Sequence, residues 1–172
     1  MRTISIIDLV DALEVRLTEI LENIKRSPSS FNSDPEVLET KFKIFKYMFP
    51  NKQANEYDSL GIPNAPDLPG VVIRPHECME EQPGGEDGKN WKVRLIFGIE
   101  DENHEGLKSL CIITEMVANE LLKKRTLADQ FRLNYPIKTV ISNEMPWPVW
   151  LMVLETTWNV PQIEEEFNYH DR

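Results

Sequence analysis

Hydrophobic and polar residues alternate in one stretch of the chain, and an unbroken apolar run occurs in another. Every second residue between positions 91 and 99 is apolar, the period of a strand with one buried face: Trp91, Val93, Leu95, Phe97 and Ile99. The run Trp150-Leu151-Met152-Val153-Leu154 opens a second long strand, which extends to Val160. We expect these two strands to be the central pair of one sheet.

Two further stretches carry apolar residues at helical spacing, which buries one stripe of a helix. The first predicted helix covers residues 5–24, and Ser5 followed by Asp8 resembles the capping box that starts a helix. The second covers residues 107–122. The apolar stripes are Ile6, Leu9, Val10, Leu13, Leu17, Ile20, Leu21 and Ile24 in the first helix, and Leu107, Leu110, Cys111, Thr114, Val117, Ala118, Leu121 and Leu122 in the second.

The second helix has apolar residues outside this stripe: Ile112, Ile113 and Met116. A helix that is apolar over so much of its circumference is covered on two sides. The second cover is either more of the same chain or a neighbouring subunit, so these three residues are candidates for an interface.

Shorter strands complete the predicted fold. Residues 41–47 alternate, residues 71–74 form a strand that Pro75 ends, and residues 135–141 form an edge strand because Pro136 lacks a backbone donor. We predict an α+β fold with a mostly antiparallel sheet of about five strands and two main helices on one face. Residues 1–163 form a single domain with long loops at 51–69 and 80–90, and residues 164–172 form an acidic tail.

The chain has 172 residues and a formal net charge of −10, which disfavours binding to phosphate backbones. Its densest basic run, Lys123-Lys124-Arg125, lies at the end of the second helix, where cations complement the helix dipole. Of the two cysteines, Cys111 is predicted to be buried, and the pattern leaves a disulfide with Cys78 open. No signal segment or membrane-spanning run is present, so we expect a soluble protein made in a cytoplasm.

Two patterns of acidic residues imitate metal sites. Asp101, Asn103 and Glu105 resemble the start of a calcium loop, but the twelfth position, which should be Glu, is Ile112. These acids are better explained as the start of a helix. Asp67 with Asp87-Gly88-Lys89 fits a loose nuclease pattern, yet these residues fall in turns rather than on a rigid strand. We therefore predict no metal site.

The remaining chemical candidates are isolated. His76, His104 and His170 have no ligand partner at helical spacing, and the chain has no nucleophile elbow and no phosphate-binding glycine loop. We predict no catalytic residue, no cofactor and no enzyme activity.

The tryptophans divide into two groups. Trp91, Trp150 and Trp158 fall on strands and are predicted to pack in the core. Trp147 lies between Pro146 and Pro148, which makes it either core filler or the anchor of an interface.

The succession KVRLIFGIEDENHEGLKSLCIITEMVANELLKKRTLADQFRLNYPI, followed by EMPWPVWLMVLETTWNVPQI, resembles the small tail-completion proteins of tailed bacteriophages. Their tail terminators share an early helix, a strand, an acidic turn, a helix, an FRL-x-YP connector and a final strand ending near Trp and Pro. The resemblance is good over residues 91–163 and only in outline before them; the loop 51–69 and the acidic tail have no match in it.

The resemblance implies a structural virion protein that caps the tail tube as a ring, typically a hexamer, and joins it to the head connector. Its partners would be copies of itself, the tail-tube protein and the connector or neck protein, and DNA would pass through the lumen without specific binding. Alternatives are another neck adaptor or tube component, or the equivalent part of a phage-derived contractile particle. A small acidic adaptor or inhibitor, or an enzyme, is a further alternative of a different class.

Overall fold

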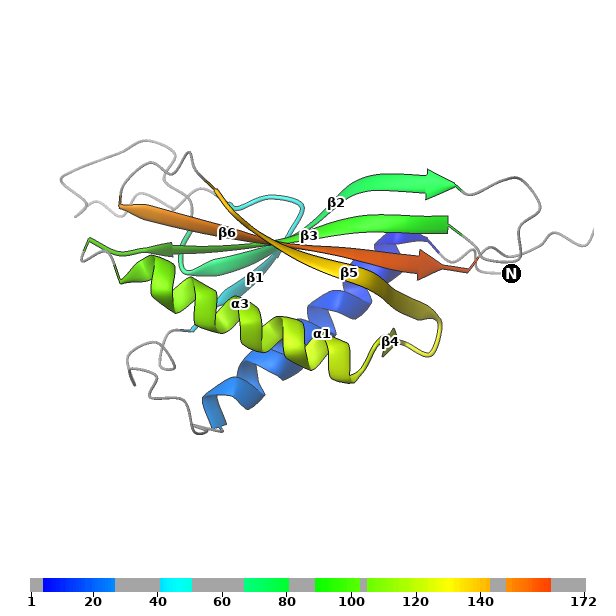
Figure 1. Cartoon of the computed structure of the whole chain (residues 1–172), viewed down its shortest axis with the longest axis horizontal. Coiled ribbons are helices and arrows are strands. Elements are labelled where there is room, and N and C mark those ends of the chain that lie inside the picture. The colour runs from blue at the N-terminus through cyan, green and yellow to red at the C-terminus, as the bar shows by residue number, and fades with distance from the viewer. Residues whose placement is uncertain are drawn as a thin grey trace, which may run out of the picture.

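The computed structural model describes residues 5–26, 41–50, 67–80, 89–102, 105–142 and 148–161. The fold is α+β, with two helices and a curled, mostly antiparallel sheet of six strands (Figure 1). The elements are α1 (Ile6–Arg26), β1 (Lys43–Lys46), β2 (Gly70–Glu80), β3 (Lys89–Glu100), α3 (Gly106–Lys123), β4 (Thr126–Leu127), β5 (Phe131–Ile141) and β6 (Val149–Val160). The predicted fold class is confirmed, and β4 is a short strand that the sequence pattern did not indicate.

The sheet has the strand order β1-β2-β3-β6-β5-β4. β3 and β6 pair antiparallel along their whole length at its centre, with Leu95 opposite Leu154. The expected central pair is therefore confirmed. β1 pairs parallel to β2, whereas all other neighbours are antiparallel.

Both helices cover the same face of the sheet (Figure 1): α1 contacts β1, β2 and β4, and α3 contacts β3, β5 and β6. In the middle of the central strands, the side chains that point toward the helices are buried, because each second side chain of a strand faces the same side. Trp91, Ile99 and Trp150, nearer the strand ends, are half-buried on this face. The largest fully buried side chains of the described residues are Trp158, Phe97, Phe131, Leu9, Leu13, Leu17, Ile20, Ile73, Leu95, Leu110, Leu121 and Leu133.

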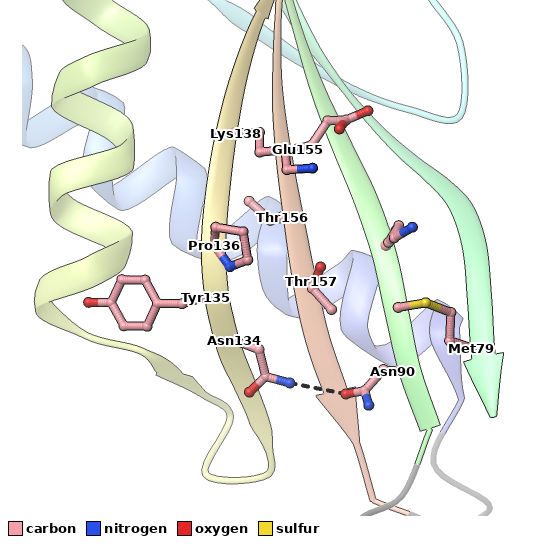
Figure 2. A pocket seen from close by; sticks show the side chains of 10 residues that line it. Met79, Asn90, Asn134, Tyr135, Pro136, Lys138, Glu155, Thr156 and Thr157 are labelled. Carbon is pink, nitrogen blue, oxygen red and sulfur yellow. Dashed lines mark hydrogen bonds between the residues drawn. The ribbon is translucent and has the colours of Figure 1, made fainter. Parts of the chain in front are cut away.

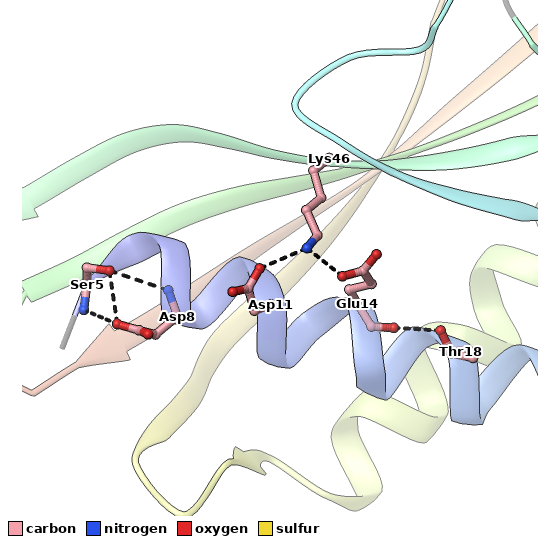
Figure 3. Close-up of polar contacts among 6 residues, drawn as sticks. All are labelled: Ser5, Asp8, Asp11, Glu14, Thr18 and Lys46. Carbon is pink, nitrogen blue, oxygen red and sulfur yellow. Dashed lines mark hydrogen bonds and ion pairs between the residues drawn. The ribbon is translucent and has the colours of Figure 1, made fainter.

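The N-terminus of α1 has the predicted capping interaction. The backbone N–H of Ser5 donates to Oδ2 of Asp8 at 2.9 Å, and the hydroxyl oxygen of Ser5 accepts from the backbone N–H of Asp8 at 3.4 Å (Figure 3). One turn further on, Lys46 of β1 pairs with Asp11 at 2.8 Å and Glu14 at 2.5 Å. The two carboxylates raise the pKa of Lys46, chiefly through the hydrogen bond to Asp11. This cluster attaches the edge strand β1 to α1.

Two sequence predictions about strand ends are wrong. β2 continues past Pro75 to Glu80, because the missing proline donor falls at a register irregularity between Pro75 and Glu77. The predicted loop 80–90 is correspondingly shorter at both ends, since Glu80 lies in β2 and Lys89 in β3. β1 is also shorter than predicted, ending at Lys46 before Tyr47, which has a φ of 72°.

Cys111 was predicted to be buried and is exposed. Helical spacing places it at the border of the buried stripe of α3, and the side of α3 that faces solvent includes this position. Trp91, Trp150 and Trp158 pack in or against the core as predicted.

Gly106 begins α3 under the ring of Trp150. A Cβ atom at this position would lie 2.5 Å from Cδ1 of Trp150 and 3.1 Å from Cβ of Asp101. The indole cannot easily move away, because its Nε1 donates to the carbonyl oxygen of Asp101 at 3.0 Å. The close approach therefore requires glycine.

We expect Gly106→Ala to lower the free energy of unfolding by about 1–3 kcal/mol, since overpacking outweighs the gain in helix propensity. Chemical denaturation followed by circular dichroism measures this loss. In the background of Trp150→Leu, which removes the obstructing ring, the same substitution should cost much less. Equal costs in both backgrounds would contradict the contact as the cause.

Candidate functional site: the open face and the free edge of the sheet

The face of the sheet that points away from α1 and α3, here called the open face, has an apolar half and a polar half. In the apolar half, Val72, Ile96, Val153 and Val140 are successive cross-strand neighbours on β2, β3, β6 and β5. Val72 is buried, Ile96 and Val153 are half-buried, and Val140 is 44% exposed. This apolar row therefore crosses four strands and ends in solvent.

More apolar side chains lie beside this row. A Cβ atom on Gly98 would point onto the open face and meet Leu68, Leu151 and Phe49 within 3.2 Å. Phe49 in turn packs edge-on against Phe45, with ring centroids 6.0 Å apart. The apolar half is thus built from β1, β2, β3, β5 and β6 and the residues that flank β1 and β2.

In the polar half, a charged row follows the apolar one. Arg74, Arg94, Glu155 and Lys138 are cross-strand neighbours on the same four strands. Arg94 pairs with Glu155, with Nη2 of the arginine 2.8 Å from Oε1 of the glutamate. In this row the two arginines therefore lie side by side, and the Glu155 carboxylate separates them from Lys138. Cross-strand neighbours of like charge repel each other unless a counter-charge joins them.

A shallow groove of about 360 Å³ lies over this polar half (Figure 2). Its lining comes from β2, β3, β5 and β6, and β5 changes register against β6 between Asn134 and Lys138. At one end, the side-chain amide of Asn134 donates to Oδ1 of Asn90 at 3.0 Å. The lining residues are Met79, Asn90, Lys92, Asn134, Tyr135, Pro136, Lys138, Glu155, Thr156 and Thr157.

The polar half carries an excess of positive charge. Lys92 pairs with Glu77 at 2.7 Å, and this hydrogen bond lowers the pKa of the Glu77 carboxyl. Arg94 is paired with Glu155, whereas Arg74, Arg132 and Lys138 make no ion pair within the described part of the chain. The strand registers place all five cations on the open face. A chain with a net charge of −10 thus concentrates cations on one surface.

β5 provides a free edge next to this face. β4 pairs only with Phe131 and Arg132, so no described strand covers the outer side of β5 from Asn134 to Ile141. Tyr135 is 63% exposed and Ile141 46% exposed on this edge. The guanidinium of Arg125 lies 4.6 Å from the centre of the Tyr135 ring, which holds the ring beside the strand. The predicted edge strand is confirmed here.

The three interface candidates on α3 differ in how deeply their side chains are buried. Ile113 is only 3% exposed and belongs to the core, so its assignment outside the buried stripe is wrong. Ile112 and Met116 are half-buried, and Met116 packs against the core. The second side of α3 is covered by α1, and Nη2 of Arg16 donates to the carbonyl oxygen of Glu120 at 3.2 Å. Trp147, the other candidate, lies outside the described residues.

The residues tested for metal chemistry do not converge within the described part of the chain. Asp67 accepts two hydrogen bonds from Nζ of Lys43, at 2.8 and 2.9 Å, and His76 is exposed on β2. Among the described residues, no group of three or more His, Cys, Asp or Glu side chains could hold a metal ion. Ile112 lies inside α3 as predicted, whereas Glu105 at the start of α3 makes no capping hydrogen bond with its side chain. Asp87, Asn103, His104 and His170 lie outside the described residues.

Sequence reasoning missed the open face because it read the strands one at a time. Arg74, Lys92 and Arg94 alternate with buried residues, which was a readable sign of a charged outer face. That they form one surface with Lys138 and Arg132 depends on the register of strands far apart in the sequence.

A scan against protein-family models matches none of them, and a search of curated proteins finds no match to the chain. No helix in the described ranges is long and apolar enough to cross a membrane.

Proposed function

We propose that this chain is a structural virion protein of a tailed bacteriophage, a tail terminator that caps the tail tube as a ring and joins it to the head connector. The ring would be a homo-oligomer, typically a hexamer, assembled in the cytoplasm of the host bacterium. This function needs no catalytic residue, metal or cofactor, and its sites are surfaces between subunits.

The observation that carries the proposal is the free edge of β5 together with the apolar row that ends at Val140. An uncovered strand edge offers backbone donors and acceptors, and folded proteins usually protect such edges. Here the edge bears exposed Tyr135, Val140 and Ile141 instead. Packing against a second subunit would bury these groups, and a ring gives each copy the same contact.

The order of elements supports the same function. The segment that carries the resemblance to tail terminators corresponds to β3, α3, β5 and β6, and the FRL-x-YP motif opens β5. The final strand ends at Val160, directly before Pro161. These elements form most of the sheet, so the resemblance falls on the parts that position the free edge.

The charge distribution fits a ring around DNA if the open face points toward other subunits. Most of the chain is acidic, and acidic walls let a phosphate backbone pass without adhering. The cations of the open face would then be covered by protein contacts in the assembled ring.

We expect Val140→Lys/Ile141→Lys to fold normally and to lose assembly onto tail tubes, because two charges at the free edge oppose burial there. Electron microscopy of tail tubes assembled without this chain, incubated with each variant, measures the fraction of capped ends. The control is Ile7→Lys/Val15→Lys, which alters two similarly exposed apolar residues on α1.

A wild-type chain that stays monomeric and leaves the tube ends bare would contradict the proposed function. Binding at another position would select among the alternatives. Rings at the connector indicate a neck adaptor, incorporation along the tube indicates a tube component, and binding to a headless contractile particle indicates its equivalent part. Binding to a small protein partner only would indicate an adaptor or inhibitor.

A further inference from the structure

The polar half of the open face is complementary to a segment of the chain's own sequence. The face carries Arg74, Lys92, Arg94, Arg132 and Lys138 against two carboxylates, those of Glu77 and Glu155. Residues 163–169 read Ile-Glu-Glu-Glu-Phe-Asn-Tyr, with three consecutive acids followed by two aromatic residues. We propose that this polar half of one subunit's open face, with its groove, binds the acidic segment 164–169 of a second copy. This inference rests on the proposed ring.

Two of the three glutamates can span the distance between two of the cations. On β6, Arg132 lies opposite Asn159 and Lys138 lies opposite Glu155, four residues away. At a rise of about 3.3 Å per residue, the two cations are about 13 Å apart along the strand. Glu164 and Glu166 of an extended segment are about 7 Å apart at their Cα atoms. Their side chains add the remaining reach to both cations.

The carboxylates of a short acidic peptide fit this surface better than the phosphates of a nucleic acid do. Glu77 and Glu155 lie among the cations and each pairs with one of them, so the three uncompensated cations are Arg74, Arg132 and Lys138. DNA adhesion requires several phosphate contacts from a surface that is basic throughout. Three cations separated by carboxylates and by Asn90, Asn134 and Thr157 suit a short acidic peptide.

A second copy is the more direct source of the segment. β6 runs from the apolar row toward the Asn159 end, and its chain leaves the sheet there. To occupy its own groove, the chain would have to reverse direction directly after Val160. Binding to a second copy does not require this reversal within residues 161–163, and a head-to-tail contact of this kind closes a ring by repetition.

The test is an exchange of charges in the full-length chain. The groove variant is Arg132→Glu/Lys138→Glu, which changes Lys138 in the groove lining and Arg132 on the same face beside it. The segment variant is Glu164→Lys/Glu166→Lys, and the charge control is Lys41→Glu/Lys124→Glu, two exposed cations away from the groove. Self-association is measured by sedimentation velocity over a concentration series. Each of the first two variants alone should need at least about tenfold more protein to associate, because like charges then face each other. The control should behave as the wild type.

Mixing the groove and segment variants in equal amounts should restore association, since every groove then finds a complementary segment on another copy. If the mixture fails while a single chain carrying both changes recovers wild-type behaviour, the segment binds its own chain and the inference is wrong. Unchanged association of either variant, or a wild type that stays monomeric, also overturns it. If a short DNA duplex binds the wild type and only the groove variant loses this binding, the occupant is nucleic acid and the inference fails.

The experiments can refute the proposed function and the proposed contact between copies independently of each other. Association that follows the charge exchange without capping of tail tubes refutes the proposed function and keeps the contact between copies. Capping that is unaffected by the exchange refutes the contact and keeps the function.

Discussion

Trp158→Ala should lower the free energy of unfolding by about 3–5 kcal/mol, the cost of removing a large aromatic side chain from a packed core. Trp158 is 0% exposed and is one of the largest fully buried side chains. Its Nε1 donates to Oγ1 of Thr156 at 2.9 Å, and this hydroxyl donates to the carbonyl oxygen of Val93 at 2.8 Å. The substitution therefore creates a cavity and also interrupts a buried chain of hydrogen bonds.

The matched control is Trp91→Ala, which removes the same side chain from the residue directly opposite on β3. Trp91 is only half-buried, so its loss should be clearly smaller. Urea denaturation followed by circular dichroism avoids dependence on tryptophan fluorescence. Equal losses for the two variants would contradict the assignment of Trp158 to the centre of the core.

The second prediction with a large effect compares two neighbouring residues of β6 that point to opposite faces of the sheet. Leu154 is fully buried under the helices, and its neighbour Val153 points to the open face and is half-buried. Leu154→Ala should cost about 2–5 kcal/mol of the free energy of unfolding, because it leaves a cavity between β6, β3 and the helices. Val153→Ala should lower the free energy of unfolding of the isolated subunit far less.

In the proposed ring, we expect the larger effect on association to come from Val153→Ala instead. Val153→Ala should weaken association between subunits, since Val153 belongs to the apolar row that a partner would cover. Leu154→Ala should act only through stability. Denaturation of the monomer and sedimentation of the assembly, measured on the same two variants, separate these contributions. A large loss of monomer stability for Val153→Ala would mean that the open face is covered within the chain itself.

Local patterns predicted much of the fold because they reflect local physics. The alternation from Trp91 to Ile99 and the stripe from Ile6 to Ile24 each follow from one buried face of one element, so they required no knowledge of the rest of the chain. The pairing of β3 with β6 was also predictable, because both are long and strongly apolar.

The errors came from contacts that local pattern does not encode. Pro75 stays inside β2 because a register irregularity accommodates it. Ile113, in contrast, is buried because it lies three residues after Leu110 and four before Val117, in the same buried stripe of α3. The two-residue strand β4 exists only through its pairing with β5. The open face depends on the register of four strands at once, which the pattern of a single element does not supply.

The strand order also bears on the timing of synthesis. β3 lies at the centre of the sheet between β2 and β6, and β6 is the last strand among the described residues. A nascent chain thus holds one side of β3 unpaired until residues 149–160 have been made, and the Leu95 face lacks its partner Leu154 until then. Sheets whose strands pair over such long sequence separations fold slowly, and their unpaired apolar strands are prone to aggregation until the pairing is complete. In the ring proposed above, the supply of assembly-ready monomer would then depend on how quickly β6 pairs with β3.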